Sequence, residues 1–243
     1  LQAQGADLVI TVDCGAAAED ALEHAARIGL DVVVVDHHLM RERRPPCLAL
    51  VNPNQPGCNS GQGDMAAAGV VFVLLAALNR EGRARGLFGD RPQPDIRRWM
   101  DLAALGGVCD VTALRGFNRA LVSLGLGVMS DWANPGLRAL LEVADAQPGP
   151  AKVNHAGFIL GPRINAGGRI GRADLGARLL ATDDPGEAAA LARQLDELNR
   201  ERREIERQVQ DAAVRRVESA GWHADGSAVV VVAGEDWHPG VVG

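Results

Sequence analysis

The sequence predicts an α/β fold in which helices flank a parallel β-sheet. Residues 7–13 and 31–35 are apolar and rich in β-branched side chains, which is typical of strands buried in a parallel sheet. Between them, residues 16–28 are alanine-rich with an apolar face, and Gly29 follows at a position that ends helices. A strand, a helix and a second strand in this order predict a βαβ unit with adjacent parallel strands.

Polar side chains follow both of these strands. Asp13 ends the first, and Asp36, His37 and His38 end the second. Ligands of open α/β sheets bind at the carboxyl ends of the strands, so we expect these side chains to share one crevice. Carboxylates and imidazoles together suit a divalent metal ion. The alternatives are a surface histidine pair in a turn and, for Asp13, a helix cap; the convergence of two strand ends favours the metal site.

Asp110 is a third candidate ligand. It follows Gly106 and Gly107, which permit close backbone approach, although a helix cap or a turn would also explain a single carboxylate. In the segments around Asp110 the pattern predicts a short strand at residues 48–51. It also predicts helices at residues 65–80, 95–103, 118–129 and 134–143.

Residues 161–171 form a glycine-rich stretch that we expect to be a phosphate-binding loop. Its glycines allow main-chain amides to face an anion, and Arg163 and Arg169 offer bidentate contacts, with Asn165 between them. A plain surface loop is the alternative. The stretch has no lysine at the position that a nucleotide-binding P-loop requires.

Residues 184–219 predict one long helix, with Asp184 as its N-cap and Pro185 at its first position. Its apolar stripe is narrow and its middle is highly charged, which favours a connector between domains over a core helix; a coiled-coil partner is the alternative. The valine-rich residues 228–233 predict the first strand of a second α/β domain.

Composition excludes several classes of protein. A net charge of −6 argues against a globally basic nucleic-acid-binding protein, and 3% aromatic residues leave little for base stacking, so nucleic-acid contacts would go mainly to the backbone. The four cysteines form no CxxC pair, and there is neither a signal segment nor an apolar run of membrane-spanning length. We expect a cytoplasmic protein without a membrane partner.

Several segments together resemble the DHH phosphoesterase family, and within it the RecJ branch of single-strand-specific exonucleases. They are TVDCG (11–15), VDHHL (35–39), VNP (51–53), ALGGVCD (104–110), GPRINA (161–166) and WHPGVVG (237–243). The resemblance implies 5′→3′ hydrolysis of single-stranded DNA in repair and recombination, with two Mn²⁺ or Mg²⁺ ions. It also implies a helicase and a single-strand-binding protein as possible partners.

The resemblance assigns a role to individual residues. Asp13 is similar to a carboxylate that bridges two ions, and His37 and Asp110 to further ligands of one ion. His38 is similar to a catalytic histidine facing the scissile phosphate, and Asp36 to the carboxylate that orients its neighbours. The residues that the resemblance assigns to phosphate or DNA binding are Arg163, Asn165, Arg169 and His238.

The expected domains are a DHH phosphoesterase domain at 1–182, the connector helix at 183–221 and the start of a DHHA1-like domain at 226–243. The family's first metal motif would lie before Leu1, so we expect the chain as given to be nearly inactive. Two other functions stay open: a phosphodiesterase of the same family acting on short oligonucleotides, cyclic dinucleotides or pyrophosphate, and a degenerate nucleic-acid-binding relative without catalysis.

Overall fold

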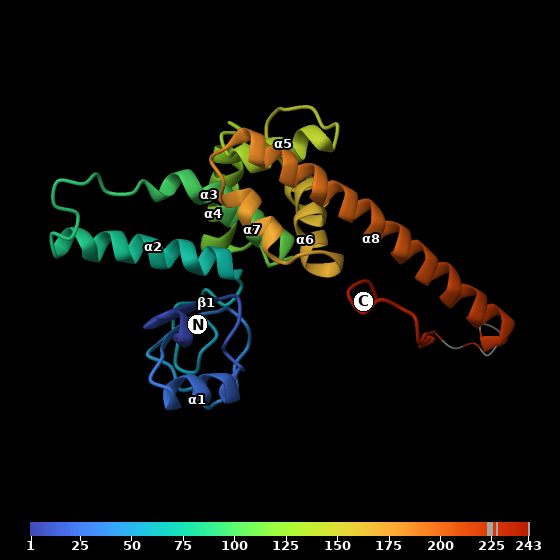
Figure 1. Cartoon of the computed structure of the whole chain (residues 1–243), viewed down its shortest axis with the longest axis horizontal. Helices are drawn as coiled ribbons and strands as arrows, with labels where there is room; N and C mark the ends of the chain where they lie inside the picture. Colours follow the sequence, from blue (N-terminus) through green and yellow to red (C-terminus); the bar gives the residue numbers. More distant parts are fainter. Residues whose placement is uncertain (223–225, 227, 243) are drawn as a thin grey trace. The chain divides into compact units, whose positions relative to one another are not determined.

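The computed structural model describes residues 1–222, 226 and 228–242, and these form two compact units (Figure 1). The first unit comprises residues 1–131 and 149–157, and the second comprises residues 132–148 and the described part of 158–243. The boundary therefore falls inside the segment expected to be one domain, 1–182. No helix among the described residues is long and apolar enough to cross a membrane.

The first unit contains a parallel sheet of three strands in the order β1-β2-β3, which confirms the predicted α/β fold. The strands are β1 (Leu8–Val12), β2 (Asp31–Val35) and β3 (Ala49–Val51). Helix α1 (Glu19–Arg27) connects β1 to β2, as the βαβ pattern predicts.

Helices cover both faces of β2 and β3. On one face α1 packs against the sheet, and on the other lie α2 (Ala67–Ala84), α3 (Met100–Cys109) and α4 (Gly116–Met129) (Figure 1). The buried residues of the α1 face are Leu22, Ala25, Val32, Val34 and Leu50, and those of the other face are Val35, Met65, Val70, Ala103 and Leu121. This burial holds the carboxyl ends of the strands in place.

Strand β1 is only half covered, so the expectation of a fully buried strand is wrong there. Leu8, Ile10 and Val12 are 49%, 58% and 54% exposed. The register pairs Ile10 with Val33 and Val12 with Val35, so these side chains continue the face that α2 to α4 cover over β2 and β3. Among the described residues, no helix extends that cover over β1.

The second unit is helical. It consists of α5 (Pro135–Val143), α6 (Gly161–Ile170), α7 (Asp174–Ala181) and α8 (Pro185–Ser219). Asp184 caps α8, as predicted, by accepting a hydrogen bond from the Gly186 amide at 2.8 Å. The short 3₁₀-helices η1 (Gln2–Gln4) and η2 (Ile96–Trp99) and the π-helical segment η3 (His155–Leu160) complete the described elements.

Helix α8 is more than a connector. Its first half is buried against α5, α6 and α7 through Ala188, Leu191, Ala192 and Leu195, and only its second half is largely solvated. Small residues in the first half of α8 allow this close helix packing without a wide apolar face.

Two further expectations fail in the second unit. Residues 161–170 form helix α6, so the expectation of a loop conformation is wrong there. Glycine lowers helix propensity, but here it permits close packing: a Cβ added at Gly167 of α6 would lie 3.1 Å from Leu195 Cδ2 on α8. Residues 228–233 form no strand, because no strand among the described residues pairs with them; Val229 and Val231 are 77% and 87% exposed. Gly243, the last residue of the WHPGVVG segment, lies outside the described residues.

Candidate metal centre

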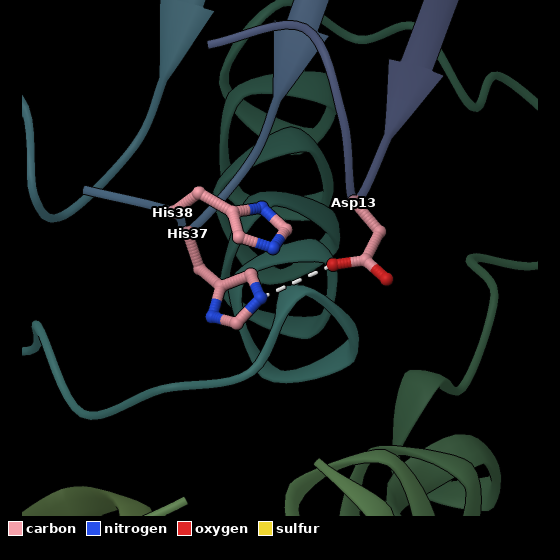
Figure 2. A group of neighbouring side chains, drawn as sticks. All are labelled: Asp13, His37 and His38. Carbon is pink, nitrogen blue, oxygen red and sulfur yellow. Dashed lines mark ion pairs between the residues drawn. The ribbon is translucent and has the colours of Figure 1, made fainter. Parts of the chain in front are cut away.

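The predicted ligands come together at one edge of the sheet. Asp13 directly follows β1, and Asp36 to His38 directly follow β2, whose register pairs Val12 with Val35. Figure 2 shows that the carboxylate of Asp13 and the rings of His37 and His38 face a common space. Asp110 reaches the same site from the C-terminal end of α3, where it is the C-cap residue.

The distances are those of a ligand cluster. Nε2 of His37 lies 3.1 Å from Oδ1 of Asp13 and 3.6 Å from Oδ2 of Asp110. One potential ligand atom from each of Asp13, His37 and His38 lies within 4.8 Å of the other two. The family resemblance implies that His38 faces the scissile phosphate, whereas by distance alone it also belongs to the ligand cluster.

The Nε2 atom of His37 shows that the residues fit a metal ion. This nitrogen is buried and forms no hydrogen bond among the described residues, although two carboxylate oxygens lie close to it. A buried polar atom without a partner is costly, and neighbouring carboxylates repel one another. A divalent cation bound to the nitrogen and to both carboxylates would remove both penalties.

Asp36 organises the two histidines. It is 1% exposed, and its carboxylate accepts hydrogen bonds from the amides of Ala16 (2.9 Å), His37 (2.7 Å) and His38 (3.2 Å) and lies 2.7 Å from Nδ1 of His38. Burial by itself raises the pKa of Asp36, but these hydrogen bonds together outweigh it and the pKa lies below the ordinary value. The residue is therefore an anion whose geometry is fixed.

His38 receives its orientation from Asp36. The hydrogen bond between Nδ1 and the Asp36 carboxylate raises the pKa of His38 above its ordinary value. Its side chain is 60% exposed, so Nε2 points away from the interior and is accessible to a ligand. This arrangement fixes one ring nitrogen and leaves the other free for chemistry.

The backbone is strained beside two of the carboxylates. Asp13 itself has φ +62°, and Val111, directly after Asp110, has φ +54°. A positive φ is uncommon for residues other than glycine, especially for β-branched valine, and clusters at functional sites. Gly15 has φ +114°, and a Cβ there would lie 3.0 Å from both Thr11 Oγ1 and Val34 Cγ1.

Two asparagines that had no assigned role also support the site. Asn52 is 2% exposed and donates through Nδ2 to the carbonyl of His38 at 3.0 Å. Its Oδ1 accepts from the amide of Asn54 at 2.7 Å, and Nδ2 of Asn54 donates to the carbonyl of His37 at 2.6 Å. Asn52 lies within the VNP segment (51–53) and Asn54 directly follows it. Their side-chain contacts have no counterpart in the hydrophobic periodicity of the sequence, so only the family resemblance pointed to this segment.

The N-terminal part of the chain matches a family model. Residues 2–106 match the model described as the DHH family, N-terminal domain. The whole chain is similar to exonucleases called RecJ: it is 39% identical to the single-stranded-DNA-specific exonuclease RecJ of Escherichia coli (strain K12), over 99% of this chain and 42% of the relative. The chain is therefore similar to the DHH family over residues 2–106 and to RecJ exonucleases over its whole length.

A second curated relative is similar over the whole chain. The chain is 37% identical to the single-stranded-DNA-specific exonuclease RecJ of Bacillus subtilis (strain 168), over 100% of this chain and 29% of the relative. It spans less than half of the length of these curated relatives.

Solved structures have the same fold. The crystal structure of the exonuclease RecJ bound to manganese matches with a TM-score of 0.79 and 34% identity, over 98% of this chain and 56% of that one. RecJ of Thermus thermophilus in complex with Mn²⁺ matches with a TM-score of 0.78 and 36% identity, over 99% of this chain and 34% of that one.

The other predicted site residues lie in the second unit. Asn165 and Arg169 are exposed, one helical turn apart on α6. Nη1 of Arg169 donates to the carbonyl of Gly240 at 3.0 Å, and Nδ1 of His238 accepts from the Gly240 amide at 3.1 Å, so these residues lie together.

Arg163 differs from its neighbours because it is engaged inside the second unit. Its Nε donates to Asp196 on α8 at 2.9 Å, and its Nη1 donates to the carbonyl of Ile159 at 2.8 Å. The side chain is only 16% exposed. Of the predicted phosphate-contacting arginines, Arg169 is therefore the more accessible.

Proposed function

We propose that this chain is the catalytic part of a metal-dependent exonuclease that hydrolyses single-stranded DNA from its 5′ end, acting in DNA repair and recombination. The observation that carries the proposal is the buried Nε2 of His37, which forms no hydrogen bond among the described residues and lies close to the carboxylates of Asp13 and Asp110. Relatives called single-stranded-DNA-specific exonucleases and crystal structures of RecJ with Mn²⁺ support the substrate and the ion.

Asp13, His37 and Asp110 are the residues that would hold Mn²⁺ or Mg²⁺. Bound ions would supply Lewis acidity toward the phosphoryl oxygens and would lower the pKa of a water nucleophile. Residues of β2 and α3 that lie in the core, Val35 and Ala103, support the ends of these elements, which carry His37 and Asp110.

His38 is proposed to act on the scissile phosphate, with Asp36 as the residue that positions it. Asp36 holds Nδ1 of His38 at 2.7 Å, so the exposed Nε2 is directed outward and can donate a proton to a phosphoryl oxygen. A donor in this position stabilises negative charge that develops on the phosphate during the displacement. Asp36 thereby orients the histidine without contacting the substrate.

The proposed contacts to the DNA backbone lie in the second unit. Asn165, Arg169 and His238 are brought together by the contact of residues 238–240 with α6, which supports a shared phosphate site. Arg163 is proposed to contribute through Nη2 alone, because Asp196 and Ile159 engage its other donors.

Three further proposals concern the whole protein. The chain would comprise a DHH phosphoesterase domain at 1–182, the connecting helix at 183–221 and the start of a DHHA1-like domain at 226–243. A helicase and a single-strand-binding protein are proposed partners, because an enzyme that acts on single-stranded DNA needs the two strands of a duplex to be separated. Co-purification of each partner with the tagged protein tests this. The proposed location is the cytoplasm, which fractionation of cells tests.

The decisive experiment follows nucleotide release from single-stranded DNA labelled at either end, using the protein that carries this chain. We expect Mn²⁺-dependent release that starts at the 5′ end and stops in EDTA. His37→Ala should lower the rate of nucleotide release by roughly 100-fold or more. Loss of a residue that only hydrogen-bonds to a metal ligand typically costs about 10- to 100-fold, and loss of the ligand itself should cost more. Asp90→Asn, at an exposed carboxylate away from the cluster, is the matched control and should keep full activity.

Three results would contradict this function. Equal rates in EDTA and Mn²⁺ would exclude the proposed metal chemistry. Faster turnover of cyclic dinucleotides or pyrophosphate than of single-stranded DNA would assign a different substrate. Binding of DNA without any hydrolysis would indicate a non-catalytic relative.

A further inference from the structure

A buried asparagine on α4 contacts the turn that follows Asp110. Asn118 is 3% exposed, and its Nδ2 donates to Thr112 Oγ1 and the Ala113 carbonyl, both at 3.0 Å. The same amide group donates to the carbonyl of Asp64 at 3.2 Å. One side chain thus joins the turn after Asp110 to the loop before α2.

The turn needs this support because its backbone is strained. Val111 has φ +54°, which a β-branched residue adopts only when its surroundings impose it. Thr112 Oγ1 donates to the carbonyl of Gly107 at 2.8 Å and so presents a lone pair to Asn118. Together, Thr112 and Asn118 fix the direction in which the chain leaves α3, and therefore the position of Asp110.

The other end of the connection is Asn54. Its Nδ2 donates to the carbonyl of His37 at 2.6 Å and to the carbonyl of Gly63 at 3.1 Å. A Cβ at Gly63 would lie 2.5 Å from Oδ1 of Asn54, so the loop approaches this side chain as closely as only glycine allows. Because Gly63 and Asp64 are consecutive, the loop links Asn54 directly to Asn118.

We propose that Asn54 and Asn118 are positioning residues that set the distance between the two ligands His37 and Asp110. The path runs from the His37 carbonyl through Asn54, the Gly63–Asp64 peptide and Asn118 to the Thr112 turn. This inference rests on the metal site proposed above.

The ligand distances explain why such a connection matters. Oδ2 of Asp110 is already 3.6 Å from Nε2 of His37, and ligand atoms must lie about 2.0–2.2 Å from a shared Mn²⁺-sized ion. Apolar packing beneath the site holds β2 and α3, but it does not set the rotation of a turn at the end of a helix. A displacement of about 1 Å at Asp110 would remove it from the shared coordination sphere.

The test measures Mn²⁺ affinity of the chain by the loss of the free-ion signal in electron paramagnetic resonance. Asn118→Leu keeps the side-chain size and removes all three donated hydrogen bonds. Thr112→Val removes only the hydroxyl, and Thr112→Ser restores it. The matched control is Asn79→Leu, because Asn79 is also buried, at 8% exposure, and donates to Pro94 at 2.9 Å, away from the ligands.

We expect Asn118→Leu and Thr112→Val to weaken Mn²⁺ binding by about 10-fold. This is the lower end of the range of about 10- to 100-fold for loss of a residue that supports a metal ligand. The Mn²⁺ affinity of Thr112→Ser should lie within about twofold of the parent's, because serine keeps the hydroxyl group that Asn118 contacts. Asn79→Leu should lower the melting temperature in EDTA but leave the Mn²⁺ affinity unchanged, which separates positioning from general stability.

Different results overturn different claims. Unchanged Mn²⁺ affinity in both Asn118→Leu and Thr112→Val would refute the positioning role while leaving the metal site intact. Absence of Mn²⁺ binding by the parent chain would refute the metal site and the positioning role together. If Asn118→Leu does not fold, the comparison of Thr112→Val with Thr112→Ser decides the question.

Discussion

Replacing Asp196 tests how the second unit holds together. Asp196 on α8 is 3% exposed and accepts from Nε of Arg163 at 2.9 Å, while Arg200 on the same helix contacts its other oxygen. We predict that Asp196→Ala strongly destabilises this unit, because it leaves the guanidinium of Arg163 without its counter-ion.

The magnitude follows from the exposure of each partner. Removing one partner of a buried ion pair costs about 3–5 kcal/mol. Arg163 is 16% exposed and keeps its hydrogen bond to Ile159, so we expect about 3 kcal/mol, the lower end of that range. The side chain of Arg200 is 73% exposed, so Arg200→Ala should cost less than about 1 kcal/mol.

The assay is urea unfolding followed by circular dichroism and by tryptophan fluorescence. Three of the four tryptophans, Trp132, Trp222 and Trp237, belong to the second unit, so fluorescence reports mainly on it. A cycle of Asp196→Ala, Arg163→Ala and the double variant should give a coupling free energy of about 2 kcal/mol.

Two results would refute this reasoning. A cost below about 1 kcal/mol for Asp196→Ala would mean that water replaces the carboxylate and that the pair is effectively exposed. Strict additivity in the cycle would mean that Arg163 does not depend on Asp196. In either case Arg163 would be free to turn toward a phosphate.

Three other predictions concern the first unit. Gly15→Ala should destabilise it by about 1–3 kcal/mol in thermal unfolding, because the residue has φ +114° and the new Cβ would lie 3.0 Å from side chains of β1 and β2; an unchanged melting temperature would contradict this. Burial raises the pKa of Asp101 above 3.8. The protonated side chain therefore contributes to stability fully below the pKa of the unfolded state, and this contribution is lost as pH rises through the pKa of the folded state. The stability gained by Asp101→Asn should grow from pH 4 to pH 7, and a gain that stays constant would contradict this. Hydrogen bonding with Ser60 lowers the pKa of Cys58, whereas burial raises that of Cys109 to about 11, so iodoacetamide at neutral pH should label Cys58 before Cys109; mass spectrometry showing the reverse order of these two would contradict this.

The parts of the site that follow strands were predictable from the sequence. Strand periodicity located β1 and β2, and the parallel register then required Asp13 and the residues from Asp36 to His38 to meet. The long helix α8 was predicted from its cap and from the absence of proline and glycine after its first turn. These features depend on local chemistry, which a single sequence displays.

The remaining features depend on long-range packing. The glycines of α6 favour a loop locally, yet Gly167 and its neighbours form a helix because α7 and α8 pack closely against it. The support from Asn54 and Asn118 joins residues up to 54 positions apart through side-chain amides, which leave no periodic signal. A strand at 228–233 would need a hydrogen-bonding neighbour, and residue propensity alone cannot supply one.

The half-covered strand β1 has a consequence for the dynamics of the site. It is hydrogen-bonded to β2 alone among the described residues, and its face of Leu8, Ile10 and Val12 is open to solvent, yet it carries Asp13 at its end. Local opening should therefore begin here, and amide hydrogens of residues 8–12 should exchange with deuterium sooner than those of β2. An ion held by Asp13 would bind only the closed form, so occupancy should slow that exchange.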